Sequence, residues 1–301
     1  MRGLLSFAAA LAVVIYSQMA AAMPLVDKAW VTARIGNPGI VFLDVRSPRA
    51  FAQGHVPGAV NTSYGRAGWR VKKGKVPGML PSMAKLEVLI GGLGISNAKH
   101  VVILPGGYSS GEMGVATRIY WTFKVAGHDA VSILDGGMGA YMGDRKARLE
   151  KGPSRPTKTT FKAVFNPAYL ATQAQVKAAL KGGVGLVDSR PNDQFVGVNK
   201  SSQVSRHGTL PGAINVPGRW ATIDDGGRFR DRSALKKLFD AVGAQTKGQT
   251  IAFCNTGHWA SLGWFVQREI LGNNEARLYD GSMAEWSQSP ANPVERKIPL
   301  D

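Results

Sequence analysis

The chain has 301 residues, of which 44% are hydrophobic and 19% are charged, a composition that excludes an intrinsically disordered protein. The length suggests two domains, each large enough to bury a core of its own. The net charge is +17, with 16 basic against 8 acidic residues over positions 24–150 and 20 against 12 over 151–301. Positive charge is therefore spread over both halves and does not form a basic tail.

A positive field attracts small anionic substrates and, weakly, anionic lipid surfaces. A generally basic surface without functional meaning explains the same charge equally well. Nucleic acid is not expected as a partner, because no basic run is interleaved with aromatic residues in a recognisable binding module.

Residues 1–22 have the layout of a secretory signal peptide. Arg2 supplies a positive charge, an apolar run follows over residues 4–16, and Ala20-Ala21-Ala22 offers a cleavage site of small residues. The apolar run is shorter than the roughly 20 residues that a membrane span needs. We expect a periplasmic or otherwise secreted protein without stable membrane insertion after cleavage. A retained N-terminal anchor is the alternative.

The rest of the chain contains two copies of one sequence plan, about 145 residues apart. Each copy has an apolar run that leads into D-x-R, then P-G-A-[VI]-N, a second apolar run and a closing segment that contains D-G. In the first copy these segments are 40–46, 57–61, 101–104 and 134–138, and in the second they are 184–190, 211–215, 250–253 and 279–283.

Residues 151–160 are rich in Pro, Gly and charge, which predicts a linker between one domain at 23–150 and another at 161–301. Short apolar runs that alternate with helical stretches predict an α/β fold in each domain, with a mainly parallel central sheet and helices on both faces. Helices are expected over 233–242 and 260–271, where apolar residues recur at helical spacing.

Cys254 is the only cysteine, so no internal disulfide can form. It follows the apolar run 250–253 and precedes a short loop and a helix expected to begin near Ala260. Ligands of parallel sheets bind beyond the carboxyl ends of the strands, which is where this thiol is expected. Loop amides and the positive end of the helix favour its thiolate, and Gly257 permits a tight cradle. An inert buried thiol is the alternative.

Together, the paired D-x-R and P-G-A-[VI]-N segments, the cysteine at a strand end and the closing D-G-G-M and D-G-S-M-A-E-W segments resemble the tandem rhodanese family. The resemblance covers nearly the whole mature chain and implies one rhodanese fold in each half. It implies chemistry in the second half alone, because Pro105 stands in the first copy where Cys254 stands in the second. The first domain is then expected to brace the site from across an interface.

The resemblance also implies the roles of individual residues. Cys254 is the nucleophile, and the substrate is held by the residues that follow it: Asn255, Thr256, Gly257, His258, Trp259 and Ala260. Arg190 is the guanidinium expected near the substrate or the loop, and Asp188 is expected to orient backbone. Four further residues of the shared blocks are interpreted as structural: His55, His207, Glu285 and Trp286.

The implied reaction is sulfur transfer through a persulfide on Cys254. The thiolate takes the outer sulfur of an anionic donor and passes it to cyanide, a thiol or a protein acceptor. Thiosulfate is favoured over 3-mercaptopyruvate, because its two negative charges suit a basic protein. No cofactor and no metal are expected, since the sequence has no clustered His and Cys ligands.

The loop after Cys254 departs from the family. Members that prefer thiosulfate tend to have basic residues there, and members that prefer mercaptopyruvate tend to have small neutral ones. His258 is expected to act as a conditional cation, because the ordinary histidine pKa is about 6.5. Trp259 either walls the pocket or packs beneath the loop.

Two other functions are alternatives to this one. A cysteine phosphatase needs an arginine six positions after the nucleophile, where this chain has Ala260. A non-catalytic periplasmic sulfur carrier or partner-binding module would have the same loop, and only turnover separates it from an enzyme.

Overall fold

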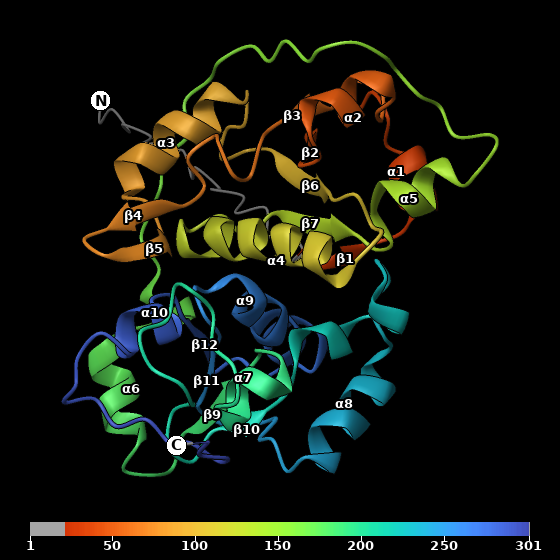
Figure 1. Cartoon of the computed structure of the whole chain (residues 1–301). Coiled ribbons are helices and arrows are strands. Elements are labelled where there is room, and N and C mark those ends of the chain that lie inside the picture. Colours follow the sequence, from red (N-terminus) through yellow and green to blue (C-terminus); the bar gives the residue numbers. More distant parts are fainter. Residues whose placement is uncertain (1–21, 301) are drawn as a thin grey trace, which may run out of the picture.

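The computed structural model describes residues 22–300, which form two α/β domains that lie one above the other in Figure 1. The expected signal peptide lies outside the described residues, except for Ala22. Over residues 22–300 no helix has the length and apolar character that crossing a membrane requires. Residues 151–160 contain no helix or strand.

Five parallel strands form the central sheet of the first domain, in the order β1-β7-β6-β2-β3. They are β1 (Leu25–Val26), β2 (Ile40–Asp44), β3 (Val60–Asn61), β6 (His100–Leu104) and β7 (Val131–Leu134). Side chains alternate along a strand, so Leu43, Val101 and Ile103 pack on one face while Phe42, Val102 and Leu104 pack on the other. The first face is covered by α3 (Met83–Gly92) and α4 (Ser110–Val125), and the second by α1 (Lys28–Thr32), α2 (Pro48–Gln53) and α5 (Gly137–Met142).

The second domain repeats this plan with five parallel strands in the order β10-β9-β11-β12-β8. They are β8 (Leu170–Ala171), β9 (Gly185–Asp188), β10 (Ile214–Asn215), β11 (Thr250–Phe253) and β12 (Ala276–Tyr279). The helices α8 (Arg232–Ala241) and α9 (His258–Phe265) cover one face, and α6 (Gln173–Ala179) and α10 (Ser282–Trp286) cover the other. The strand order is that of the first sheet when each is followed from its first strand, which confirms the duplicated α/β fold.

The remaining elements are short. They are the antiparallel hairpin β4 (Val71–Lys73) and β5 (Val76–Met79), helix α7 (Asn192–Val196), the π-helix Val266–Ile270 that continues α9, and the 3₁₀ turns Pro167–Tyr169, Gly218–Ala221 and Ile223–Asp225. The helix expected over 233–242 is α8. The helix expected over 260–271 begins two residues earlier, because Gly257 adopts the left-handed conformation directly before it.

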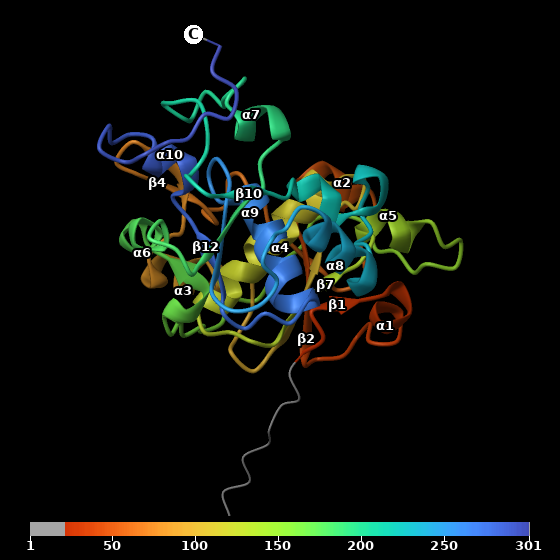
Figure 2. The same cartoon turned by 90° about the horizontal axis from the view of Figure 1, so that it is seen from below.

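Helices α4 and α9 pack against each other between the two sheets, and both views show them adjacent (Figure 1, Figure 2). The buried hydroxyls of Thr117 and Ser261 hydrogen-bond across this contact at 2.8 Å. The ring of Tyr120 meets that of Phe265 edge to face, with centroids 5.0 Å apart. Apolar residues of both domains therefore form one continuous core. Helix α4 is buried on nearly all sides because it lies between two sheets, each with an apolar face.

Candidate active site

Cys254 lies directly after β11, at the carboxyl edge of the second sheet, and only 1% of its surface is exposed. Its backbone carbonyl accepts a hydrogen bond from the Met283 amide at 2.9 Å, and the carbonyl of Asn255 accepts one from the Ala284 amide at 2.9 Å. Both donors lie in the first turn of α10, where amides have no partner inside their own helix. The start of α10 therefore fixes the first two residues of the loop.

Ser282 closes the loop at its centre. Its hydroxyl oxygen accepts from the amides of Cys254 and Gly257, both at 3.1 Å, and donates to the Tyr279 carbonyl at 2.8 Å. Residues 254–257 thereby fold back around one oxygen atom. Ser282 itself has a positive φ of 49°, which is uncommon for a residue with a side chain.

Gly257 makes the turn into α9 with φ of 75°. A Cβ at this position would lie 2.4 Å from Nη1 of Arg118. Glycine is therefore required both for the backbone conformation and for the close approach of the guanidinium.

The loop leaves several amides available for a ligand. Within residues 22–300, the amides of Asn255, Thr256 and His258 donate to no acceptor. Those of Trp259 and Ala260 belong to the first turn of α9, which has no internal acceptor for them. A loop of free amides at the start of a helix is an electropositive site for an anion.

Two arginines of the first domain hold the opposite side of the loop. Arg70 donates to the carbonyl of Thr256 at 2.5 Å, and Arg118 donates to the carbonyl of Gly257 at 3.1 Å. Arg118 also forms a buried ion pair with Asp280 at 2.5 Å. Because a peptide group points its N–H away from its C=O, these bonds leave the His258 amide directed away from the first domain. The first domain therefore braces the loop through Arg70 and Arg118.

His258 is neutral at neutral pH, which corrects the expectation of a conditional cation. Burial, together with the charges of Arg70 and Arg118, lowers its pKa to about 4. One ring nitrogen interacts with the Gly111 carbonyl, and Nδ1 lies 3.1 Å from the Tyr64 hydroxyl. Burial also raises the pKa of Tyr64, and negative charge at Cys254 adds to that increase. Tyr64 of the first domain therefore belongs to the surroundings of the thiol.

The guanidinium of Arg190 is held by partners of its own domain. Its side chain is fully buried, with Nε and Nη2 bonded to the Asp188 carboxylate and Nη2 also donating to the Gly208 carbonyl at 2.9 Å. The segment that carries Arg190 borders the loop, because the Ser189 amide donates to the Phe253 carbonyl at 2.9 Å. A contact of Arg190 with the substrate stays a prediction. The pair Asp44 and Arg46 repeats the arrangement in the first domain, so it is part of the fold.

The side chains of the loop have separate surroundings. Asn255 donates to the Gln194 side chain at 2.8 Å, while Thr256 and Ala260 are buried. Trp259 helps to line a pocket of about 180 Å³ with Ser189, Pro217 and Arg219. Cys254 does not line this pocket, so whether Trp259 walls the substrate site stays open.

The four residues interpreted as structural make contacts of that kind. Glu285 accepts a hydrogen bond from the Tyr279 hydroxyl at 2.6 Å, and the Trp286 indole donates to the Pro293 carbonyl at 2.8 Å. The rings of His55 and His207 lie against backbone carbonyls of their own domains. Over residues 22–300 no group of three or more His, Cys, Asp or Glu side chains could hold a metal ion.

The duplicated sheets define the class of protein: two α/β domains in tandem, of which the second carries the single thiol in a loop of free amides. The family model of the rhodanese-like domain matches residues 27–144 and 172–289. The chain belongs to the rhodanese family, with two such domains in tandem.

Relatives align over most of the chain. A thiosulfate sulfurtransferase of Corynebacterium glutamicum is 29% identical over 282 residues, which cover 90% of this chain and 90% of the relative. A Saccharopolyspora erythraea protein with a provisional name for the same activity is 32% identical over 282 residues, 90% of this chain and 95% of its own.

Two solved structures share the arrangement of both domains. SseA of Escherichia coli, described as a 3-mercaptopyruvate sulfotransferase, has a TM-score of 0.74 at 25% identity over 86% of this chain and 98% of its own. The anaerobic ergothioneine biosynthesis enzyme of Chlorobium limicola has a TM-score of 0.78 at 20% identity over 92% and 70%. The second likeness concerns the fold alone.

Proposed function

We propose that this chain is a sulfurtransferase in which Cys254 carries sulfur as a persulfide from an anionic donor to a thiophilic acceptor. The observation that carries the proposal is the thiol at the end of β11, followed by three amides that donate to no acceptor within residues 22–300. The names of the relatives over 90% of the chain support the same reaction class.

The reaction needs neither metal nor redox partner. The Cys254 thiolate attacks the outer sulfur of thiosulfate, an S–S bond forms, and the original S–S bond breaks with its electron pair leaving on sulfite. The persulfide anion stays in the amide loop. An acceptor nucleophile then attacks the terminal sulfur, and the Cys254 thiolate leaves. Because the chain has no second cysteine, an external acceptor such as a thiol, cyanide or a protein completes the cycle.

Thiosulfate is the donor we propose, with 3-mercaptopyruvate as the alternative. Arg70 has no carboxylate partner within residues 22–300, although its guanidinium bonds the Thr256 carbonyl two residues after the thiol. Its charge is therefore not compensated locally, unlike that of Arg118. An uncompensated cation beside a loop of free amides favours a dianion over a monoanion.

The test is steady-state sulfur transfer to cyanide, with thiosulfate and 3-mercaptopyruvate compared as donors. Cys254→Ser is the matched control, because it changes one atom of a buried side chain. Turnover that disappears in this variant supports the enzyme, and the donor with the higher kcat/KM decides the substrate. Formation of a persulfide without turnover would instead indicate a sulfur carrier. The absence of both turnover and persulfide would refute both roles.

We also propose that the protein is exported, on the pattern of Arg2, the apolar run 4–16 and Ala20-Ala21-Ala22. Expression in a bacterium with a periplasm should give a mature chain that begins near Met23. N-terminal sequencing of the periplasmic fraction measures this directly. A full-length chain in the cytoplasmic or membrane fraction would contradict it.

A further inference from the structure

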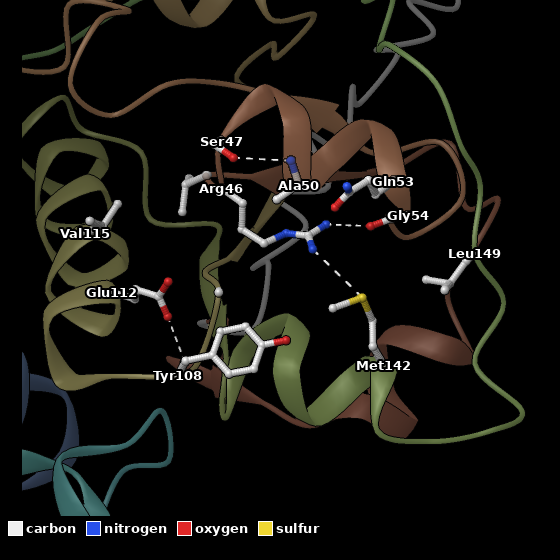
Figure 3. A pocket seen from close by; sticks show the side chains of 12 residues that line it. Arg46, Ser47, Ala50, Gln53, Gly54, Tyr108, Glu112, Val115, Met142 and Leu149 are labelled. Atoms are coloured by element: carbon white, nitrogen blue, oxygen red, sulfur yellow. Dashed lines mark hydrogen bonds between the residues drawn. The ribbon is translucent and has the colours of Figure 1, made fainter.

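The first domain has a pocket of about 430 Å³ at the carboxyl edge of its own sheet (Figure 3). Val45 and Arg46 follow β2 on one side, and Gly106 and Tyr108 follow β6 on the other. Cys254 follows β11, which is the counterpart of β6. The pocket therefore lies at the edge of the non-catalytic domain that corresponds to the active-site edge of its partner domain, and the size is ordinary for a small-molecule site.

Arg46 presents one guanidinium nitrogen to this pocket. Its side chain is 7% exposed, with Nε and Nη2 bonded to Asp44 and Nη2 also bonded to the Gly54 carbonyl. Nη1 has only the Met142 sulfur, at 3.9 Å. Since a thioether is a weak acceptor, this nitrogen is available for a stronger one. In the second domain Nη1 of Arg190 also lacks a partner, but that side chain is fully buried and lines none of the pockets described for residues 22–300.

The opposite wall carries a carboxylate and an aromatic ring. One oxygen of Glu112 accepts from the Tyr108 amide at 2.7 Å, and the other accepts no hydrogen bond within residues 22–300. Tyr108 is 66% exposed, and in Figure 3 its ring lies beside Glu112 and below the Arg46 guanidinium. A carboxylate beside an aromatic ring is a favourable position for an ammonium group. Val115 and Leu149 add apolar surface.

The charges of the pocket argue against a simple anion. Asp44 already neutralises Arg46 in a bidentate pair, so Nη1 offers a directed hydrogen bond with little net charge behind it. Glu112 adds a negative charge at the other wall. A ligand with an acceptor at one end and a cation at the other satisfies both walls without leaving a buried charge unpaired.

We propose that this pocket binds a small zwitterion, an α-amino acid with an apolar side chain. Its carboxylate accepts from Nη1 of Arg46, and its ammonium group donates to Glu112 beside the Tyr108 ring. Its side chain packs on Val115, which lies on the Glu112 side of the pocket (Figure 3). The site is separate from Cys254 and does not depend on the reaction proposed for it.

The test measures binding by calorimetry to the full-length chain that carries Cys254→Ser, so that no sulfur chemistry contributes. The probes are L-leucine, 4-methylpentanoate, which lacks the ammonium group, and 3-methylbutylamine, which lacks the carboxylate. We expect L-leucine to bind, and each analogue to bind at least about tenfold more weakly, because each loses one charge-assisted hydrogen bond.

Glu112→Gln distinguishes the proposed site from any other, since glutamine keeps an oxygen for the Tyr108 amide and removes the charge. It should weaken L-leucine about tenfold, and it should not weaken 4-methylpentanoate, which has no ammonium group for Glu112 to bind. Glu275→Gln removes an exposed carboxylate that does not line the pocket and should change neither. The proposal is overturned if L-leucine does not bind at millimolar concentration, if 4-methylpentanoate binds as tightly, or if Glu112→Gln has no effect.

Discussion

At the scale of single residues, Arg70 connects the first domain to the loop after Cys254. We expect Arg70→Gln to lower kcat/KM for thiosulfate by about tenfold to a hundredfold, because a hydrogen bond from a charged group contributes about 1.5–3 kcal/mol. Sulfur transfer to cyanide measures this. Arg66→Gln is the matched control, since Arg66 lies in the same segment and is exposed. Equal losses of kcat/KM in the two variants would show that net charge alone causes the effect, and not the bond from Arg70 to the loop.

His258 gives a prediction about stability and pH. Its pKa is about 4 in the folded protein and 6.5 as the ordinary value, so unfolding takes up a proton between these pH values. The free energy of unfolding should therefore fall as pH falls from about 6.5 to 4, by about 1–3 kcal/mol from this residue.

Urea unfolding of the wild type and of His258→Gln across this range isolates the contribution. His100 and His128 also have pKa values lowered by burial, and they act in the same direction in both proteins. The dependence on pH should be shallower in the variant. Parallel curves would show that His258 is not held neutral by the fold.

The D-x-R segment has a structural role in both domains. The D-x-R segment occurs in both copies, and the first copy has no thiol, so a catalytic role cannot explain its presence there. Asp44 with Arg46 and Asp188 with Arg190 form the same ion pair, which ties the end of a central strand to a neighbouring turn. The duplication could have shown this role before the structure did.

At the scale of elements, the strands and the place of Cys254 were predictable because they depend on local patterns. Apolar runs of four or five residues gave the central strands, and the break after residue 253 gave the loop. The hydroxyl of Ser282 at the centre of the loop was not predictable, because its position depends on a positive φ at the start of α10. The short edge strands lacked a pattern long enough to recognise.

The turn from the loop into α9 can be tested with a pair of glycines that have similar backbone conformations. Gly257 and Gly243 have φ of 75° and 71°, but a Cβ at Gly243 would meet nothing within 4 Å, whereas one at Gly257 would reach Arg118. Gly243→Ala should cost about 1 kcal/mol of stability and keep sulfur transfer. Gly257→Ala should also displace Arg118 and abolish sulfur transfer. Full activity of Gly257→Ala would contradict the role of this contact.

At the scale of the whole molecule, the site combines residues that are remote in sequence. Arg70 and Thr256 are 186 positions apart, and Arg118 and Gly257 are 139 apart. Such contacts form only when the two domains pack together through α4 and α9. No pattern of neighbouring residues in the sequence predicts them. This is why sequence analysis could assign a bracing role to the first domain but could not name Tyr64, Arg70 or Arg118.

A core shared by both domains should make them unfold together. Tyr120 of α4 packs against Phe265 of α9 and is 1% exposed, whereas Tyr108 is 66% exposed. We expect one calorimetric transition for the wild type, and Tyr120→Ala should lower its free energy of unfolding by about 3–5 kcal/mol. Sulfur transfer should fall as well, because α4 also carries Arg118.

Tyr108→Ala is the control, since it removes the same side chain from an exposed position and should leave both stability and sulfur transfer nearly unchanged. Two separate transitions in the wild type would mean that each domain is stable alone. The contact of α4 with α9 would then contribute to the position of the Cys254 loop without contributing to the stability of the second domain. In that case Tyr120→Ala should shift only the transition of the first domain.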